Sequence, residues 1–215
     1  MLPLQGLFAQ KDLSAFYEPQ IALGFKSDSS RWSFNFALSE RNAIYENEET
    51  QFQALFLDIQ HFSNYEVGLY GKLSLGLKIR SLEIFEESAH DEIRLTAQYG
   101  YSRKYNTLKI AHRLRYENRF EDQTAFRSRY RISVEIPLEG AKHNQNEFFI
   151  SLKTETLFSF GKFMAPELDQ RVGADLGYQL FENTEISLGL EYQYEDYFHD
   201  PESELFVLTE VSISL

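Results

Sequence analysis

The chain has 215 residues, a net charge of −12, 15 % aromatic residues and no cysteine. The length suits one sizeable domain, and the absence of cysteine excludes disulfide bridges, thiolate nucleophiles and cysteine-based zinc sites. The acidic balance argues against a nucleic-acid-binding protein, because such a protein needs a basic surface to neutralise phosphates.

The first residues form a mildly apolar arm. Residues 1–10 are followed by the charged pair Lys11 and Asp12. This pattern is typical of the tail of a secretory signal peptide, and equally of an ordinary N-terminal arm. We therefore interpret residues 1–13 as an arm or signal-peptide remnant, which can also contribute a first strand, and residues 14–215 as a single domain.

The dominant signal in the rest of the chain is alternation of apolar and polar residues over segments of roughly 10 to 14 residues. Ordinary strands average about 5 or 6 residues, whereas a tilted strand that crosses a bilayer needs about 9 to 11. No run of about 18 apolar residues occurs, so no transmembrane helix is predicted. The pattern predicts strands at residues 16–26, 31–40, 52–62, 66–80, 92–101, 109–120, 126–136, 147–158, 171–180, 185–195 and 205–215.

These segments predict eleven strands. A barrel with both termini on one side needs an even number, so one strand is missing. The stretch before Ser14 would supply the missing strand. We therefore expect an all-β, up-and-down antiparallel barrel of about 12 strands, with 10 as the alternative. Short polar breaks at 27–30 and 63–64 and longer acidic ones at 41–51 and 81–91 show the expected loop asymmetry.

The polarity of the two strand faces indicates whether lipid or water surrounds the barrel. The strands of a water-soluble sandwich or barrel also alternate between apolar and polar residues, with the apolar face inward. Here the polar face mixes Arg and Glu with small residues, as a packed lumen requires, and the strands are uniformly long. The pattern predicts a transmembrane barrel of a bacterial outer membrane, with a soluble β-protein as the alternative. Aromatic residues expected in interfacial girdles are Tyr17, Tyr65, Tyr101, Tyr105, Tyr116, Phe120, Tyr178 and Tyr194.

Two adjacent predicted strands carry a basic ladder on their polar faces. Its members are Lys109, Arg113, Arg115, Arg119, Arg127, Arg129 and Arg131. If these strands pair as a hairpin, the residues form a cationic track on the lumen wall. Later strands carry a predicted acidic wall: Asp175, Glu185, Glu191 and Glu195. Opposed basic and acidic walls produce a field across a pore, and arginine tracks select anions.

The same residues have a second interpretation as lumen packing. Narrow barrels fill their lumens with Arg–Glu pairs that neutralise each other away from bulk water. In that case Arg113 and Arg129 pair with Glu117 and Glu135 and plug the interior. A barrel near 12 strands lies between filled and open sizes, so both interpretations stay open.

Other chemistry-bearing residues give weaker signals. The five His are scattered without metal-ligand spacing, so neither a metal site nor a cofactor is predicted. A membrane-embedded hydrolase would need His, Ser and a third orienting group, for which His61 near Ser63 is the local candidate. We expect a protein that is not an enzyme.

Several short motifs resemble a known family. They are His112-Arg113-Leu114-Arg115-Tyr116-Glu117, Arg127-Ser128-Arg129-Tyr130-Arg131, residues 147–155, Gln170-Arg171-Val172-Gly173 and Gly189-Leu190-Glu191-Tyr192. Through them the chain resembles an uncharacterised family of bacterial outer-membrane proteins, catalogued as domain of unknown function 2490, over most of its length after Phe16. The resemblance implies a small single-chain barrel with no established activity. A looser similarity to monomeric acidic-oligosaccharide porins implies basic tracks on opposing walls, whereas here the basic residues concentrate on one side.

The predicted function is a small outer-membrane channel through which anionic or polar solutes diffuse passively. The residues expected to attract the solute are Arg113, Arg115, Arg127, Arg129 and Arg131, opposite Glu191 and Glu195. The alternatives are a non-conducting structural or interaction barrel with a charge-filled lumen and, more remotely, the hydrolase. Expected partners are outer-membrane lipids, lipopolysaccharide and small anionic solutes.

Overall fold

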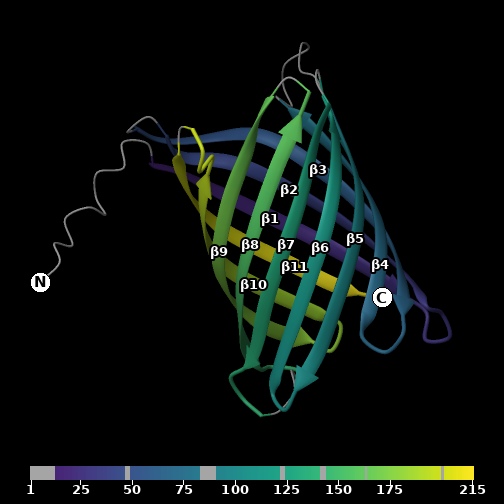
Figure 1. The fold of residues 1–215 in the computed structure, drawn as a ribbon. Coiled ribbons are helices and arrows are strands. Elements are labelled where there is room, and N and C mark those ends of the chain that lie inside the picture. Colours follow the sequence, from purple (N-terminus) through teal and green to yellow (C-terminus); the bar gives the residue numbers. More distant parts are fainter. Residues whose placement is uncertain are drawn as a thin grey trace, which may run out of the picture.

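The computed structural model describes residues 13–46, 49–82, 91–121, 124–140, 144–162, 164–199 and 201–215. These residues form one closed β-barrel (Figure 1), which confirms the predicted all-β barrel fold. No helix within the described ranges is long and apolar enough to cross a membrane. The strands are β1 (Leu13–Lys26), β2 (Trp32–Glu46), β3 (Glu49–Val67), β4 (Gly71–Leu82), β5 (Glu92–Tyr105), β6 (Leu108–Phe120), β7 (Thr124–Pro137), β8 (Phe148–Gly161), β9 (Met164–Phe181), β10 (Thr184–Glu195) and β11 (Glu202–Ser214).

The barrel closes through a parallel pair. Strands β1 and β11 run side by side from Leu13 opposite Ser203 to Gly24 opposite Ser214, whereas neighbours in sequence pair antiparallel. Because successive strands alternate in direction, the first and the last of the eleven described strands point the same way. The pair that closes the barrel is therefore parallel. The described strand number therefore lies between the predicted 12 and 10, and the even-number argument does not apply. Of the arm expected at residues 1–13, Leu13 begins β1, and residues 1–12 lie outside the described residues.

The two rims of the barrel receive different connections. The β1–β2, β3–β4, β5–β6, β7–β8 and β9–β10 connections lie at the rim where β11 ends, here called the C-terminal rim. The opposite rim, where β1 begins, is called the N-terminal rim (Figure 1).

Two predicted breaks are wrong. Strand β3 continues through residues 63–64 to Val67, and the chain turns at residues 68–70, where Gly68 has a φ of 64°, a conformation that glycine adopts without steric cost. Strand β2 continues through residue 41 to Glu46. A register shift between Arg41 and Asn42 breaks its alternation, which is why the sequence pattern predicts a loop there.

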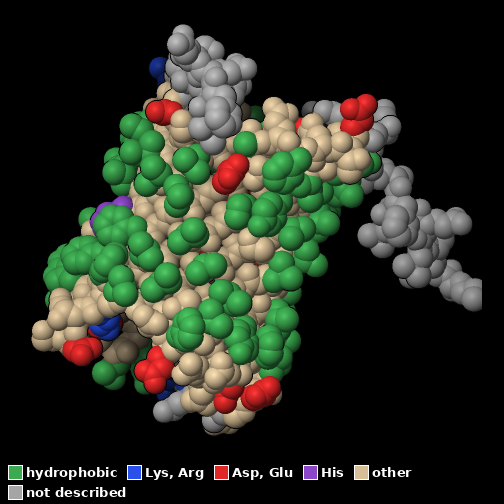
Figure 2. All heavy atoms as spheres, turned by 180° about the vertical axis from the view of Figure 1, so that it is seen from behind, with side chains coloured by type: hydrophobic (Ala, Val, Ile, Leu, Met, Phe, Trp, Pro, Cys, Tyr) green, Lys and Arg blue, Asp and Glu red, His purple; other side chains and the backbone are tan. Residues whose placement is uncertain are grey.

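Polar side chains point into the barrel and apolar side chains point outward. Leu75 on the outer face is 70 % exposed, whereas the inward Asp58 is 1 % exposed. Figure 2 shows hydrophobic side chains spread over the flank of the barrel, with charged groups few and mostly near its ends. Successive residues of a strand point to opposite faces, so the sequence alternation produces this division directly.

A few large apolar rings are packed inside the barrel. Phe16, Phe56 and Phe206 surround the guanidinium group of Arg41, whose central carbon lies 4.6 to 5.6 Å from the three ring centroids. Phe62 lies over Gly76, where an added Cβ would come within 2.3 Å of the ring. The rings fill part of the lumen, and the remaining interior surface is largely polar.

Aromatic side chains cluster on the outer face near both rims. Near the C-terminal rim, ring centroids are 5.0 Å apart for Trp32 and Tyr65 and 5.9 Å apart for Tyr70 and Tyr101. The clusters near the N-terminal rim include the pairs Tyr116–Phe126 at 6.2 Å, Phe126–Phe160 at 5.6 Å and Tyr194–Tyr197 at 4.5 Å. The apolar flank is therefore bounded by aromatic rings at both ends.

Candidate functional site

A cavity of about 360 Å³ lies inside the barrel and is lined by residues of all eleven strands, so it is a part of the lumen. Its four carboxylates are Glu18, Asp175, Glu191 and Glu210. Its ten cationic residues are Arg41, Lys78, Arg80, Arg94, Arg113, Arg115, Arg129, Arg131, Lys153 and Arg171. Although the whole chain is acidic, the surface of this cavity presents mainly positive groups.

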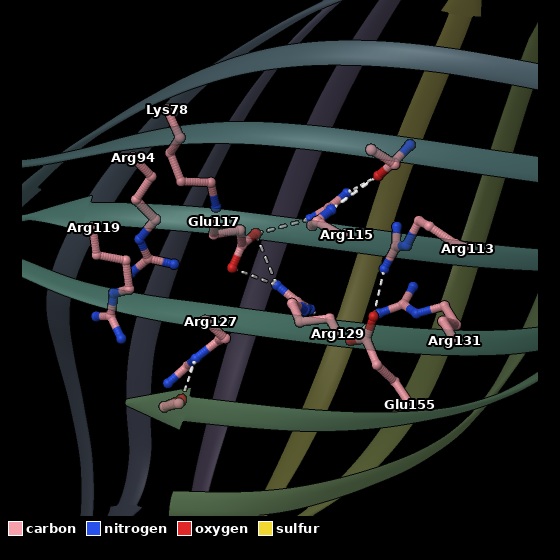
Figure 3. Close-up of polar contacts among 12 residues, drawn as sticks. Lys78, Arg94, Arg113, Arg115, Glu117, Arg119, Arg127, Arg129, Arg131 and Glu155 are labelled. Atoms are coloured by element: carbon pink, nitrogen blue, oxygen red, sulfur yellow. Dashed lines mark hydrogen bonds and ion pairs between the residues drawn. The ribbon is translucent and has the colours of Figure 1, made fainter. Parts of the chain in front are cut away.

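The β6–β7 hairpin forms the centre of the basic side (Figure 3). Its register sets Arg113 opposite Arg131 and Arg115 opposite Arg129, all on the inward face. Like charges directly opposite each other destabilise a sheet. The hairpin therefore depends on carboxylates supplied close by.

Two glutamates are shared among these four arginines. Glu155 of β8 accepts hydrogen bonds from Arg113 at 2.8 Å, Arg129 at 2.5 Å and Arg131 at 3.0 Å. Glu117 of β6 accepts from Arg115 at 3.3 Å and Arg129 at 3.2 Å. Both glutamates are buried. Four guanidinium groups thus share two carboxylates, which leaves the hairpin with a local excess of positive charge.

The same sharing extends along the neighbouring strands. Asp58 accepts from Lys78 at 2.6 Å and from Arg80 at 2.8 Å. Glu92 pairs with Arg94 and, at 2.7 Å, with Arg119. Each of these carboxylates is therefore shared by two or three cations. We call this part of the lumen the basic wall: the inward cations of β4 to β7.

The opposite side of the barrel has the reverse balance. Lys153 pairs with both Asp175, at 3.2 Å, and Glu191, at 3.5 Å. Together with Glu18 and Glu210, these carboxylates form an acidic wall on β9, β10, β11 and β1. The lumen is therefore polarised across its width.

Side-chain length explains why cations dominate the cavity surface. The partner carboxylates Asp58, Glu92, Glu117 and Glu155 are buried and do not line the cavity. The longer Arg and Lys side chains extend beyond them toward the lumen. Because guanidinium and ammonium groups only donate hydrogen bonds, the cavity offers chiefly donors.

Comparison with known proteins identifies the family. A family model described as a protein of unknown function, DUF2490, matches residues 20–204. The chain belongs to this family. The match begins in β1 and ends in β11, so it spans the whole basic wall. Neither the curated proteins nor the solved structures give a significant match.

In this DUF2490 barrel the predicted basic ladder separates into two groups. Arg113, Arg115, Arg129 and Arg131 line the cavity. The other three members of the ladder do not line it. Lys109 pairs with Glu135 at 3.1 Å near the C-terminal rim, Arg119 pairs with Glu92, and Arg127 donates to Ser159 at 2.8 Å.

The predicted acidic wall also separates. Asp175 and Glu191 line the cavity. Glu195 lies nearer the N-terminal rim and pairs with Arg171 at 3.0 Å. Glu185 lies near the C-terminal rim, opposite Gln179 of β9. Only part of each predicted wall therefore meets at the cavity.

Sequence reasoning missed six of the lining cations. Lys78, Arg80 and Arg94 lie on the polar face of the predicted strands 66–80 and 92–101, so the alternation itself is a sufficient signal. Arg41 was hidden by the register shift in β2. The other two are Lys153 and Arg171, which project from the inward faces of β8 and β9.

The predicted histidine–serine pair lies on the outer face. His61 Nε2 is 3.0 Å from Ser63 Oγ, and the imidazole packs against Phe36 at 4.5 Å. Within the described residues, His61 Nδ1 is buried without a hydrogen-bond partner. The group that would orient a catalytic histidine is therefore missing from the described part of the chain. The described part also contains no cluster of three or more His, Asp or Glu residues placed to hold a metal ion.

Proposed function

We propose that this protein is a barrel of a bacterial outer membrane whose lumen lets small anionic or polar solutes diffuse passively. The observation that supports this proposal is the lumen cavity, which is lined by ten cationic residues and four carboxylates. Rings and tracks of Arg and Lys select anions by replacing part of their hydration shell. The barrel carries out no reaction in this proposal and needs no cofactor.

The outer face supports the membrane location. Large apolar residues are exposed around the barrel, whereas soluble monomers rarely expose continuous apolar patches larger than a few hundred Å². The aromatic clusters near both rims match the belts that Trp and Tyr form at membrane interfaces. Membrane lipids and lipopolysaccharide are the partners that such a surface would contact.

The two lumen walls suggest how passage would proceed. The basic wall draws an anion in, and the acidic wall opposite prevents it from being held too tightly. Conduction requires binding that is favourable enough for entry and weak enough for release. A polarised lumen with a moderate positive excess satisfies both requirements.

Single-channel conductance of the refolded barrel in a planar bilayer, under a salt gradient, tests the proposal. We expect anion-selective steps. The informative variant combines Arg115→Gln, Arg129→Gln and Glu117→Gln, because it removes lumen charge without leaving Glu117 buried and unpaired. Its selectivity for anions should fall, whereas Lys26→Gln, at the C-terminal rim and outside the cavity, should retain it. An unchanged reversal potential in the correctly folded triple variant would contradict the proposal.

A second candidate function is a non-conducting barrel with a charge-filled lumen. The observation that favours it is the tight burial of Glu117 and Glu155 by their arginines, together with the rings around Arg41. Such a barrel would insert into vesicles and give no conductance steps. Its function would then depend on contacts made by its connecting loops.

A further inference from the structure

Three arginines on the lumen wall lie in one row across neighbouring strands. The register sets Arg113 opposite Arg131, Arg131 opposite Glu155, Glu155 opposite Arg171 and Arg171 opposite Gln193. The row therefore crosses β6 to β10 along the direction of the hydrogen bonds between the strands. Except for Glu155, its residues line the cavity.

The row contains hydrogen-bonding groups without partners. In the part of the chain that the structure describes, the Nε atoms of Arg113, Arg131 and Arg171 are buried and have no acceptor, and Gln193 Oε1 has no donor. Arg115, two residues along β6, is different, because all three of its guanidinium nitrogens bond to Gln98 or Glu117. Arg129, which lies opposite Arg115 and outside the row, also has a buried Nε without an acceptor among the described residues. Unpaired buried donors are costly and uncommon in native proteins. The described part of the chain therefore provides no acceptor for the three Nε donors of the row.

The row also carries unbalanced charge. Arg113 and Arg131 both use Glu155, which Arg129 shares, while Arg171 pairs with Glu195. Water in the cavity would satisfy donors but would leave this charge excess in place. An oxyanion would satisfy both needs, because its oxygens accept hydrogen bonds and its charge offsets the excess. Guanidinium groups match the geometry of carboxylate and phosphate oxygens especially well.

We infer that the row formed by Arg113, Arg131 and Arg171 is a binding site for the carboxylate or phosphate group of a small solute. Glu155 acts as a positioning residue, since it holds two of these arginines from behind. The cavity volume of about 360 Å³ suits a small ion or acid. The inference rests on the proposed function and deepens it, because it names the group that the channel recognises.

Calorimetric titration of the folded protein in detergent micelles at low salt tests the site, with inorganic phosphate and acetate as separate probes. We expect saturable binding of at least one probe. Binding of phosphate alone would identify a phosphoryl group, and binding of acetate alone a carboxylate. Arg113→Gln with Arg131→Gln should weaken binding by about tenfold or more, because two charge-assisted contacts are lost. Lys26→Gln should bind as the unmodified protein does, because Lys26 is an exposed cation at the C-terminal rim outside the cavity.

Replacing both Arg113 and Arg131 leaves Glu155 buried with fewer partners, which can cause misfolding. A triple variant that also carries Glu155→Gln avoids this, because it removes the buried charge. Absence of binding to both probes, or unchanged affinity in the folded triple variant, would overturn the inference. Anion-selective conductance without saturable binding would contradict the binding site and support the channel function. Saturable binding by a barrel that gives no conductance steps would support the binding site and contradict the channel function.

Discussion

The two faces of each strand present opposite environments one residue apart. On β10, Leu190 is 56 % exposed on the outer face, and the adjacent Glu191 is 7 % exposed in the lumen. On β7, Arg129 and Arg131 reach inward while Tyr130 between them faces outward. A soluble barrel has the reverse arrangement. The interior of the barrel is therefore held together by shared charges. The apolar side chains on its outer face are the reason why hydrocarbon is proposed around it.

The largest expected effect lies on the inner face. Glu155→Gln would leave Arg113, Arg129 and Arg131 without their common carboxylate. Removing one partner of a buried ion pair costs about 3 to 5 kcal/mol. Urea-induced unfolding from lipid vesicles should show a loss of this size. The exposed Glu139→Gln is the matched control. Equal effects of the two substitutions would mean that the buried network does not hold the interior together.

The outer face gives the next effect in size. Leu190→Arg should destabilise a membrane-inserted barrel by about 2 to 4 kcal/mol, because its position in the middle of β10 would put a charge in hydrocarbon. The control is Leu69→Arg in the β3–β4 turn, where Leu69 is 91 % exposed. Its effect should stay within about 0.5 kcal/mol. If Leu190→Arg proved equally mild in the same unfolding measurement, the outer face would be a water-exposed surface.

The smallest effect belongs to the C-terminal rim, where neither face is sheltered. Lys26 and Glu66 form an ion pair of 2.5 Å, with both side chains about half exposed. Exposed pairs contribute little, and salt screens them further. Lys26→Gln should leave the unfolding midpoint unchanged at low and at high salt. A clear loss of stability that vanishes in salt would show that the rim carries an unexpected part of the electrostatic stabilisation.

Much of the fold could be predicted because each strand carries its own signal. The alternation located the strands and identified the β6–β7 hairpin whose pairing joins Arg113 to Arg131. The details that failed involve local departures from that period. The register shift beside Arg41 interrupts the alternation, and the turn at Gly68 lies within an apolar stretch that reads as continuous strand.

The amino-acid sequence alone specifies which residues of each strand share a face, because side chains alternate with a period of two wherever the backbone is extended. It also determined that basic residues of one hairpin lie close together, since such pairing is local. Which groups meet across the lumen depends on how the strands close into a ring. Ring closure brings Glu18 of β1 and Glu191 of β10 to one cavity, and Glu155 reaches Arg113 past an intervening strand. Those contacts depend on strand number and register around the whole ring, and no single segment of the sequence encodes either.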